Sequence, residues 1–84
     1  MQKIIYYIKF ALQFADMQIP ELVTVFNHLV GNIGWTGMRA YHDQALIDEF
    51  LRRGVDVSAV YDGKAIIFAH PLRYNLSNNR LELL

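Results

Sequence analysis

The sequence contains no cysteine and no excess of charge of either sign. Among its 84 residues, eight Lys and Arg balance eight Asp and Glu. Without cysteine there is no disulfide, no thiolate nucleophile and no cysteine zinc site, so a core must hold the fold, alone or completed by another chain. Proteins that bind nucleic acid usually carry a basic face. Here the basic residues stand singly except for Arg52 and Arg53, which argues against a nucleic-acid partner.

Long uninterrupted apolar runs are also missing. The apolar segment near the N-terminus is broken by Lys9, and Gln13 and Asp16 follow it. A secretory leader needs about 7–15 apolar residues in a row, and a membrane span needs about 20. The sequence therefore predicts neither a leader nor a membrane protein, and we expect a cytoplasmic location.

What the chain has in excess is apolar character. Hydrophobic residues make up 54% of the sequence and charged residues only 19%. A domain of this size buries only about 60–65% of the surface that its unfolded chain exposes, so apolar surface should remain outside the core. Contiguous exposed apolar surface usually marks a contact site, and a net charge of zero removes repulsion between copies. These features predict a homodimer, binding to another protein, or both.

The N-terminal segment, residues 3–14, fits two periodicities. With a period of two, alternate residues are apolar and share one face, which predicts a strand. With a period of 3.6, the polar residues Lys9, Gln13 and Asp16 gather on one stripe, which predicts an amphipathic helix. We favour the strand for about the first eight residues.

Two later segments carry helix signals. Residues 20–31 begin with a proline, which suits the first helical position, and end at Gly31. Residues 43–53 carry an apolar stripe, with Asp43 as the N-cap and Gly54 just past the C-terminus. The glycine-rich stretch between these two helices predicts a loop, followed by a short extended piece from residue 38 to residue 41.

The C-terminal third has the character of β structure. An Asp-Gly pair at positions 62–63 separates two β-rich runs, residues 57–61 and 64–69. Asp-Gly is a strong hairpin signal, because a type I′ turn needs positive φ at both central positions. Residues 72–76 and 80–84 fit two further short strands around a polar turn.

These elements predict one compact domain spanning residues 1–84. Its fold class is α+β, with two helices packed on a small, mainly antiparallel sheet and a C-terminal β-hairpin or meander. If residues 3–14 are helical, the alternative is three helices plus a β-hairpin.

Aromatic residues are the candidates for partner contact. The only tryptophan lies in the glycine-rich loop, and tryptophan is enriched at interface hot spots. The other aromatic residues on the predicted strands exceed what one layer of two helices needs. The predicted partner-binding residues are Trp35, Tyr6, Tyr7, Phe10 and Tyr61.

As an alternative to a binding module, one set of residues in the C-terminal strands could be catalytic. There His70 or Tyr74 would move protons and Arg73 would hold a phosphate, as in a small metal-independent ribonuclease of the toxin type. The order of the elements is loosely similar to that of RNA-cleaving toxins, but no motif is shared. The neutral charge argues against this interpretation.

The histidines of the sequence do not have the spacing of a metal-binding motif. His28, His42 and His70 lie far apart in the sequence and form no His-x-His or His-Glu-x-x-His pattern. We therefore predict no metal site and no cofactor.

The sequence favours a non-catalytic protein-binding module that acts as a regulator or inhibitor, a role that suits a phage or mobile-element protein. The third interpretation is a winged-helix-like regulator that binds nucleic acid. It requires residues 3–14 to be helical and residues 43–53 to enter the major groove, where Asp43, Asp48 and Glu49 would face phosphate.

Overall fold

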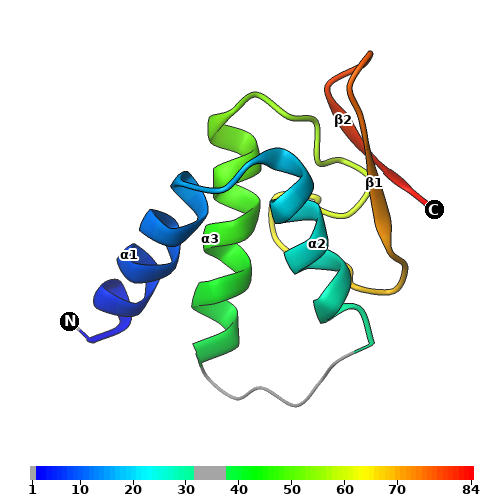
Figure 1. Cartoon of the computed structure of the whole chain (residues 1–84). Helices are drawn as coiled ribbons and strands as arrows, with labels where there is room; N and C mark the ends of the chain where they lie inside the picture. Colours follow the sequence, from blue (N-terminus) through cyan, green and yellow to red (C-terminus); the bar gives the residue numbers. More distant parts are fainter. Residues whose placement is uncertain (1, 32–37) are drawn as a thin grey trace.

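The computed structural model describes residues 2–31 and 38–84, and three helices lead into an antiparallel hairpin (Figure 1). The α+β class with a C-terminal hairpin is confirmed, in the form of three helices plus a hairpin. Helix α3 lies in the centre, with α1 on one side and α2 and the hairpin on the other (Figure 1). The elements are α1 (Gln2–Ala15), α2 (Ile19–Leu29), α3 (Met38–Arg52), β1 (Leu72–Asn75) and β2 (Arg80–Leu83).

The N-terminal segment is a helix, so the strand interpretation of its first residues is wrong. Four of its residues pack inward at the spacing i, i+3, i+4 and i+7, which is the spacing of one helix face. Apolar residues fill so many positions here that both periodicities fit the sequence, and packing against α3 selects the helix. The inward residues are Tyr7, Phe10, Ala11 and Phe14.

Helix α3 begins earlier than its sequence signals indicate. Its first residue is Met38, so neither the extended piece at residues 38–41 nor the N-cap at Asp43 is present. Asp43 is instead a buried residue inside the helix, and its carboxylate accepts a hydrogen bond from Arg39 Nε at 3.0 Å. Asp43 therefore pairs with Arg39, one turn earlier in the helix, and does not cap the helix.

The C-terminal ends of α2 and α3 follow the glycine signals. Gly31 and Gly54 have φ of +74° and +76°, a left-handed conformation that favours glycine. After α3, the N–H of Val55 donates to the carbonyl of Phe50 at 3.0 Å. This is the 6→1 hydrogen bond, which spans more residues than the other hydrogen bond of a Schellman motif. Both predicted helix ends are confirmed.

The C-terminal hairpin is confirmed as well. In the register of β1 and β2, Leu72 lies opposite Leu83 and Tyr74 lies opposite Leu81. Leu72 and Leu81 are buried and lie on the same face of the ribbon, since directly opposed residues of antiparallel strands share a face. This face joins the hairpin to the core.

The other predicted hairpin is wrong. Residues 57–69 hold one isolated bridge, between Tyr61 and Ile66, and no strand. The turn itself exists, but of its two central residues only Gly63 has positive φ, at +96°. The Asp62 carboxylate accepts hydrogen bonds from the two backbone N–H groups that follow the turn, each at 2.8 Å. An Asx-type turn therefore stands where type I′ was expected.

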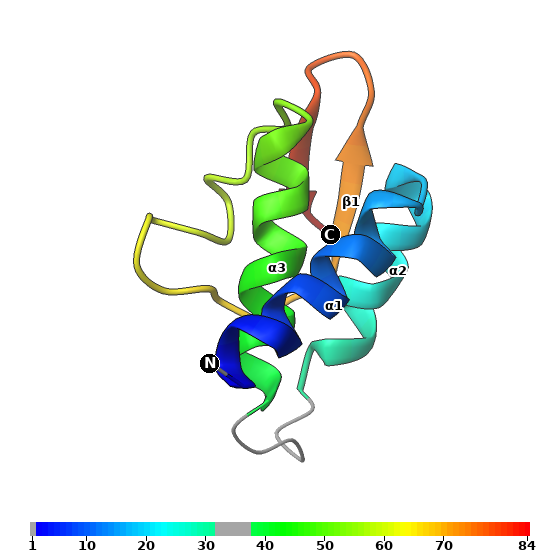
Figure 2. The same cartoon turned by 90° about the vertical axis from the view of Figure 1, so that its left-hand side faces the viewer.

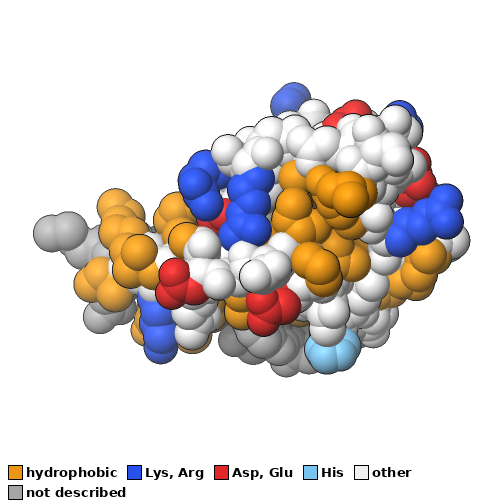
Figure 3. Space-filling model, turned by 45° about the horizontal axis from the view of Figure 1, so that its top comes forward, with side chains coloured by type: hydrophobic (Ala, Val, Ile, Leu, Met, Phe, Trp, Pro, Cys, Tyr) orange, Lys and Arg blue, Asp and Glu red, His pale blue; other side chains and the backbone are white. Residues whose placement is uncertain are grey.

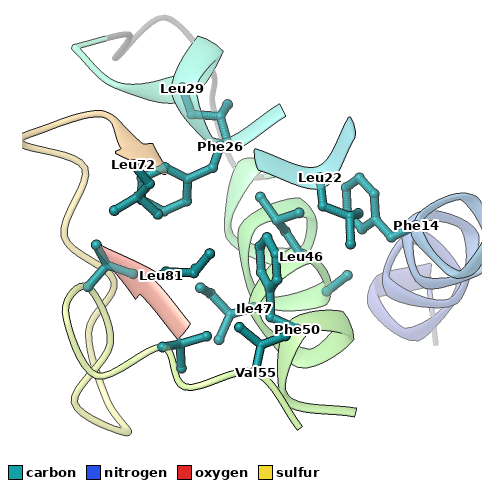
Figure 4. Packing of buried hydrophobic residues seen from close by; sticks show 13 residues of the cluster. Phe14, Leu22, Phe26, Leu29, Leu46, Ile47, Phe50, Val55, Leu72 and Leu81 are labelled. Atoms are coloured by element: carbon teal, nitrogen blue, oxygen red, sulfur yellow. The ribbon is translucent and has the colours of Figure 1, made fainter. Parts of the chain in front are cut away.

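All three helices and the C-terminal half of the chain contribute to one core (Figure 4). Phe14 reaches in from α1 toward Leu22, while Leu72 and Leu81 close the opposite side (Figure 4). The Phe26 ring stacks on Phe68 at a centroid distance of 4.7 Å. The buried hydrophobic residues are Phe14, Leu22, Phe26, Leu29, Ala45, Leu46, Ile47, Phe50, Val55, Val57, Val60, Leu72 and Leu81.

Asn27 joins α2 to the start of β1. Its Oδ1 accepts a hydrogen bond from the N–H of Leu72 at 2.7 Å, and its Nδ2 donates to the carbonyl of Leu72 at 3.0 Å. We expect Asn27→Ala to lower the free energy of unfolding by about 1–3 kcal/mol, because both partly buried groups of Leu72 lose their partner. Urea denaturation measures this loss. Asn78→Ala, in the exposed turn of the hairpin, is the control, and equal midpoints for the two variants would contradict the assignment.

Candidate functional site

Helix α1 exposes aliphatic residues along its solvent side. Ile4, Ile5, Ile8 and Leu12 are 61%, 63%, 48% and 65% exposed. In the view of Figure 2, α1 lies nearest the viewer with α2 and α3 behind it. These four residues are called the α1 outward face below.

The α1 outward face continues the buried side of the same helix. At about 100° per residue, the apolar positions from Phe10 round to Ile5 span roughly 220° of the helix circumference. An ordinary surface helix needs an apolar stripe of little more than about 100°. Helix α3 covers only the half of this span that contains Phe10 and Phe14, so about half of the apolar side has no cover within the described chain.

The described polar and charged side chains on and just after α1 lie beside this face and not on it. Lys9 and Gln13 are exposed and follow Ile5 round the helix, and Asp16 follows the last turn. Hydrophobic side chains accordingly gather on the projecting end of the molecule at the left of Figure 3. From residue 4 onward, the surface that α1 offers to a partner is aliphatic and uncharged.

The aromatic residues predicted to bind a partner are mostly engaged within the molecule. The hydroxyl of Tyr7 donates a hydrogen bond to Asp48, and this bond, with burial, raises the pKa of Tyr7 to about 12. Phe10 meets the His42 ring edge-on at 4.9 Å. Tyr61 is partly buried against the core.

Of the two remaining predicted contact residues, the structure describes only one. Tyr6 is half-buried, and Trp35 lies outside the described residues. Sequence reasoning missed the aliphatic residues that α1 exposes. Their signal was the 3-4 spacing of Ile5, Ile8 and Leu12, which is the spacing of a helix-packing seam.

A polar cluster lies on the first two turns of α3, and two of its members, His42 and Asp43, are buried. Asp43 Oδ1 is 3.1 Å from His42 Nδ1, while Arg39 donates to Asp43 and, through Nη2, to the carbonyl of Leu29 at 3.1 Å. The Arg39 guanidinium also lies 4.9 Å from the centre of the Phe68 ring. These contacts join the end of α2 to α3 and to residue 68, which is a structural role.

The alternative ribonuclease residues are not aimed at one point. Arg73 and Tyr74 are neighbours on β1, so their side chains leave opposite faces of the ribbon. Arg73 Nε donates to Glu82 at 3.2 Å, and the Tyr74 hydroxyl donates to Asn79 at 2.5 Å. Hydrogen bonds from Asn75 and Arg73 lower the pKa of Glu82. His70 is exposed ahead of the strand.

The central position of α3 bears on the winged-helix interpretation. Residues 3–14 are helical, as that interpretation requires. Seven residues of α3 are buried, however, between α1 and the remainder of the core. A recognition helix must offer a free face to the major groove. The geometry therefore does not favour α3 as a reader of DNA.

A groove of about 630 Å³ lies between the connection from α1 to α2, the C-terminal end of α3, and the end of β1. Arg53 donates through Nη2 to the carbonyls of Phe14 and Met17, at 3.0 and 2.6 Å, and thereby caps α1. The buried Glu49 carboxylate holds both Arg52 and Arg53 at 2.5 Å. Figure 3 shows Lys and Arg side chains beside a hydrophobic patch on this side of the molecule. Arg53 therefore links the C-terminal end of α1 to α3, and Glu49 neutralises the charges of Arg52 and Arg53.

The described residues form neither a metal-binding cluster nor a membrane-spanning helix. Within residues 2–31 and 38–84, no three His, Cys, Asp or Glu side chains are grouped to hold a metal ion. No helix in those ranges has the length and hydropathy that crossing a bilayer requires. Comparison of the chain with protein-family models, with curated protein sequences and with solved structures gives no match.

Proposed function

We propose that this chain is a non-catalytic protein-binding module whose contact surface is the α1 outward face. The observation that carries the proposal is the exposure of Ile4, Ile5, Ile8 and Leu12 on one side of one helix. A module of this kind acts as a regulator or inhibitor, because it changes what a bound chain can contact and performs no chemistry itself. We place it in the cytoplasm as part of the same proposal.

Burial of the face supplies the driving force for binding. Complete burial of an isoleucine or leucine side chain is worth about 1.5–3 kcal/mol, and these four side chains still have half to two thirds of their area to bury. A helix that offers residues at i, i+4 and i+8 fits an apolar groove or a second apolar helix. The partner surface must therefore be apolar and elongated.

Photo-cross-linking tests the contact in cells that express the protein. A benzophenone amino acid at Ile8 is expected to form a covalent adduct with a protein, at a yield at least about tenfold above that from the same probe at Leu76. Leu76 is 80% exposed and lies just after β1, where it lines the groove at the C-terminal end of α1 but is not part of the α1 outward face. It therefore controls for simple exposure.

Binding of the purified adduct partner completes the test. Ile8→Glu is expected to weaken that binding by at least about tenfold, since a carboxylate would be buried without a partner. Leu76→Glu is expected to leave the affinity unchanged. Similar adduct yields at both positions, or equal affinities of the two variants, would refute the proposed contact surface.

A further inference from the structure

We infer that the occupant of the α1 outward face is a second copy of this chain, with the two α1 helices packed against each other about a two-fold axis. The inference rests on the proposed function and names the partner of the same surface.

The spacing of the exposed residues fits helix-on-helix packing. Ile5, Ile8, Leu12 and Ala15 follow one another at intervals of three, four and three residues, which is the repeat of the seam between two packed helices. Ala15 is exposed like the other three. A helix of 14 residues is about 21 Å long, so the seam runs over most of α1.

The face is complementary to itself. In a two-fold contact the same patch meets its own copy, so any charge on it would meet a like charge or lose its hydration. The α1 outward face consists of aliphatic side chains alone, and the chain as a whole has a net charge of zero. Neither local nor long-range repulsion therefore opposes the contact.

The area of the face sets the strength of the contact. Four aliphatic side chains at these exposures present on the order of 400 Å² on each copy, comparable with the largest apolar patch of a typical monomer. A standard stable interface takes about 800 Å² from each partner. Residues flanking the seam add polar area to the contact, but the total remains at the low end. The dimer should therefore be reversible and depend on concentration.

A lipid surface fits the helix less well. Amphipathic helices that lie on membranes carry a polar face rich in Lys and Arg. On α1 the polar stripe has Lys9 as its described cation, with Gln13 next to it and Asp16 just after the helix. The helix is also held to α3 by Phe10 and Phe14. We therefore assign the face to a protein and treat lipid binding as an outcome of the test.

Sedimentation equilibrium over about 5 μM to about 1 mM tests the dimer. The mass of the wild-type chain is expected to rise from 9.8 kDa toward twice that value. Ile8→Glu is expected to keep the monomer mass at concentrations where the wild type is dimeric. Leu76→Glu, at a residue that is more exposed but lies outside the α1 outward face, is expected to behave as the wild type. Circular dichroism confirms that both variants are folded.

The absence of cysteine allows a second, independent measurement. A single Ile8→Cys substitution places one thiol near the middle of the seam, and Leu76→Cys places one outside the seam. Under mild oxidation, Ile8→Cys is expected to form a covalent dimer at least about tenfold faster than Leu76→Cys, because the contact raises the local concentration of the paired thiols.

Each of the following results would overturn the inference. The inference fails if the wild-type chain stays monomeric up to about 1 mM. It also fails if the Ile8→Glu variant still forms the dimer. If the chain is monomeric and the benzophenone probe at Ile8 captures a different protein, the inference fails while the proposed function stands. If the wild type binds vesicles of anionic and neutral phospholipid and Ile8→Glu does not, the face serves lipid and both proposals fail.

Discussion

Phe14→Ala is expected to lower the free energy of unfolding by about 3–5 kcal/mol, a large part of the stability of a small domain. Phe14 is 2% exposed, and its ring meets the His42 ring edge-on at 5.2 Å. It is the most deeply buried described side chain of α1 and joins this helix to the core. Its removal leaves a cavity between α1 and the helices beneath, and urea denaturation followed by circular dichroism measures the loss.

Leu12→Ala is the matched control on the same helix. Leu12 is 65% exposed, so its truncation should change stability by no more than about 0.5 kcal/mol. A strand would place Leu12 and Phe14 on the same face, whereas the helix places them on different sides. Both variants are measured at low micromolar concentration, where a weak dimer dissociates. Similar losses for the two variants would contradict the orientation of α1.

Local chemistry made several elements predictable from the sequence. A glycine just past each of α2 and α3 marked their ends, because Gly31 and Gly54 adopt positive φ there. The polar turn between β1 and β2 marked the C-terminal hairpin in the same way. These signals act within a few residues, so no knowledge of tertiary contacts was needed.

Tertiary packing decided the elements that the sequence left open or misplaced. Val57 and Val60 both enter the core although they are three residues apart, and Val60 N–H donates to the carbonyl of Val57 at 3.0 Å. This spacing belongs to a turn and not to a strand, so the β-rich composition of residues 57–61 was misleading. At the N-terminus, only contact with α3 shows which half of the apolar span is covered.

The candidate site could be predicted only in part for the same reason. Excess apolar composition correctly predicted that apolar surface remains exposed, as it does at Ile4, Ile5 and Leu12. Aromatic residues were the expected contacts because of their frequency at interfaces. In this fold Tyr7 and Phe10 face α3, where Asp48 and His42 lie. The exposed large apolar residues of α1 are thus the aliphatic ones.

Glu49 is the clearest case of a role that spacing alone did not show. The i,i+4 spacing of Glu49 and Arg53 is typical of an ion pair on the solvent face of a helix, yet the Glu49 side chain is only 5% exposed. The reason is that Arg53 turns back to the carbonyls of Phe14 and Met17 at the end of α1. Glu49 thereby supplies the counter-charge for a joint between α1 and α3, with Arg52 as its second partner.

Glu49→Gln is therefore expected to destabilise the protein strongly, by about 3 kcal/mol at neutral pH. The change preserves the shape of the side chain but leaves the Arg53 guanidinium, which is itself mostly buried, without its counter-charge. Thermal or urea denaturation measures the loss. Arg73→Gln, which breaks the exposed pair with Glu82, is the control and should cost no more than about 1 kcal/mol.

The pH dependence of this difference identifies the charge as its cause. Hydrogen bonds from Arg52 and Arg53 hold the pKa of Glu49 below its usual 4.5, against the opposing effect of burial. Because the folded pKa is the lower one, the stabilisation is complete above pH 4.5 and is lost as the pH falls through the folded pKa. The wild type and Glu49→Gln should therefore differ by a constant amount above that pH and converge below it. Asp56, Asp62 and Glu82, whose pKa values are also lowered, destabilise both proteins in acid, so they cancel in the difference. A difference that does not change with pH would mean that Glu49 acts through packing alone.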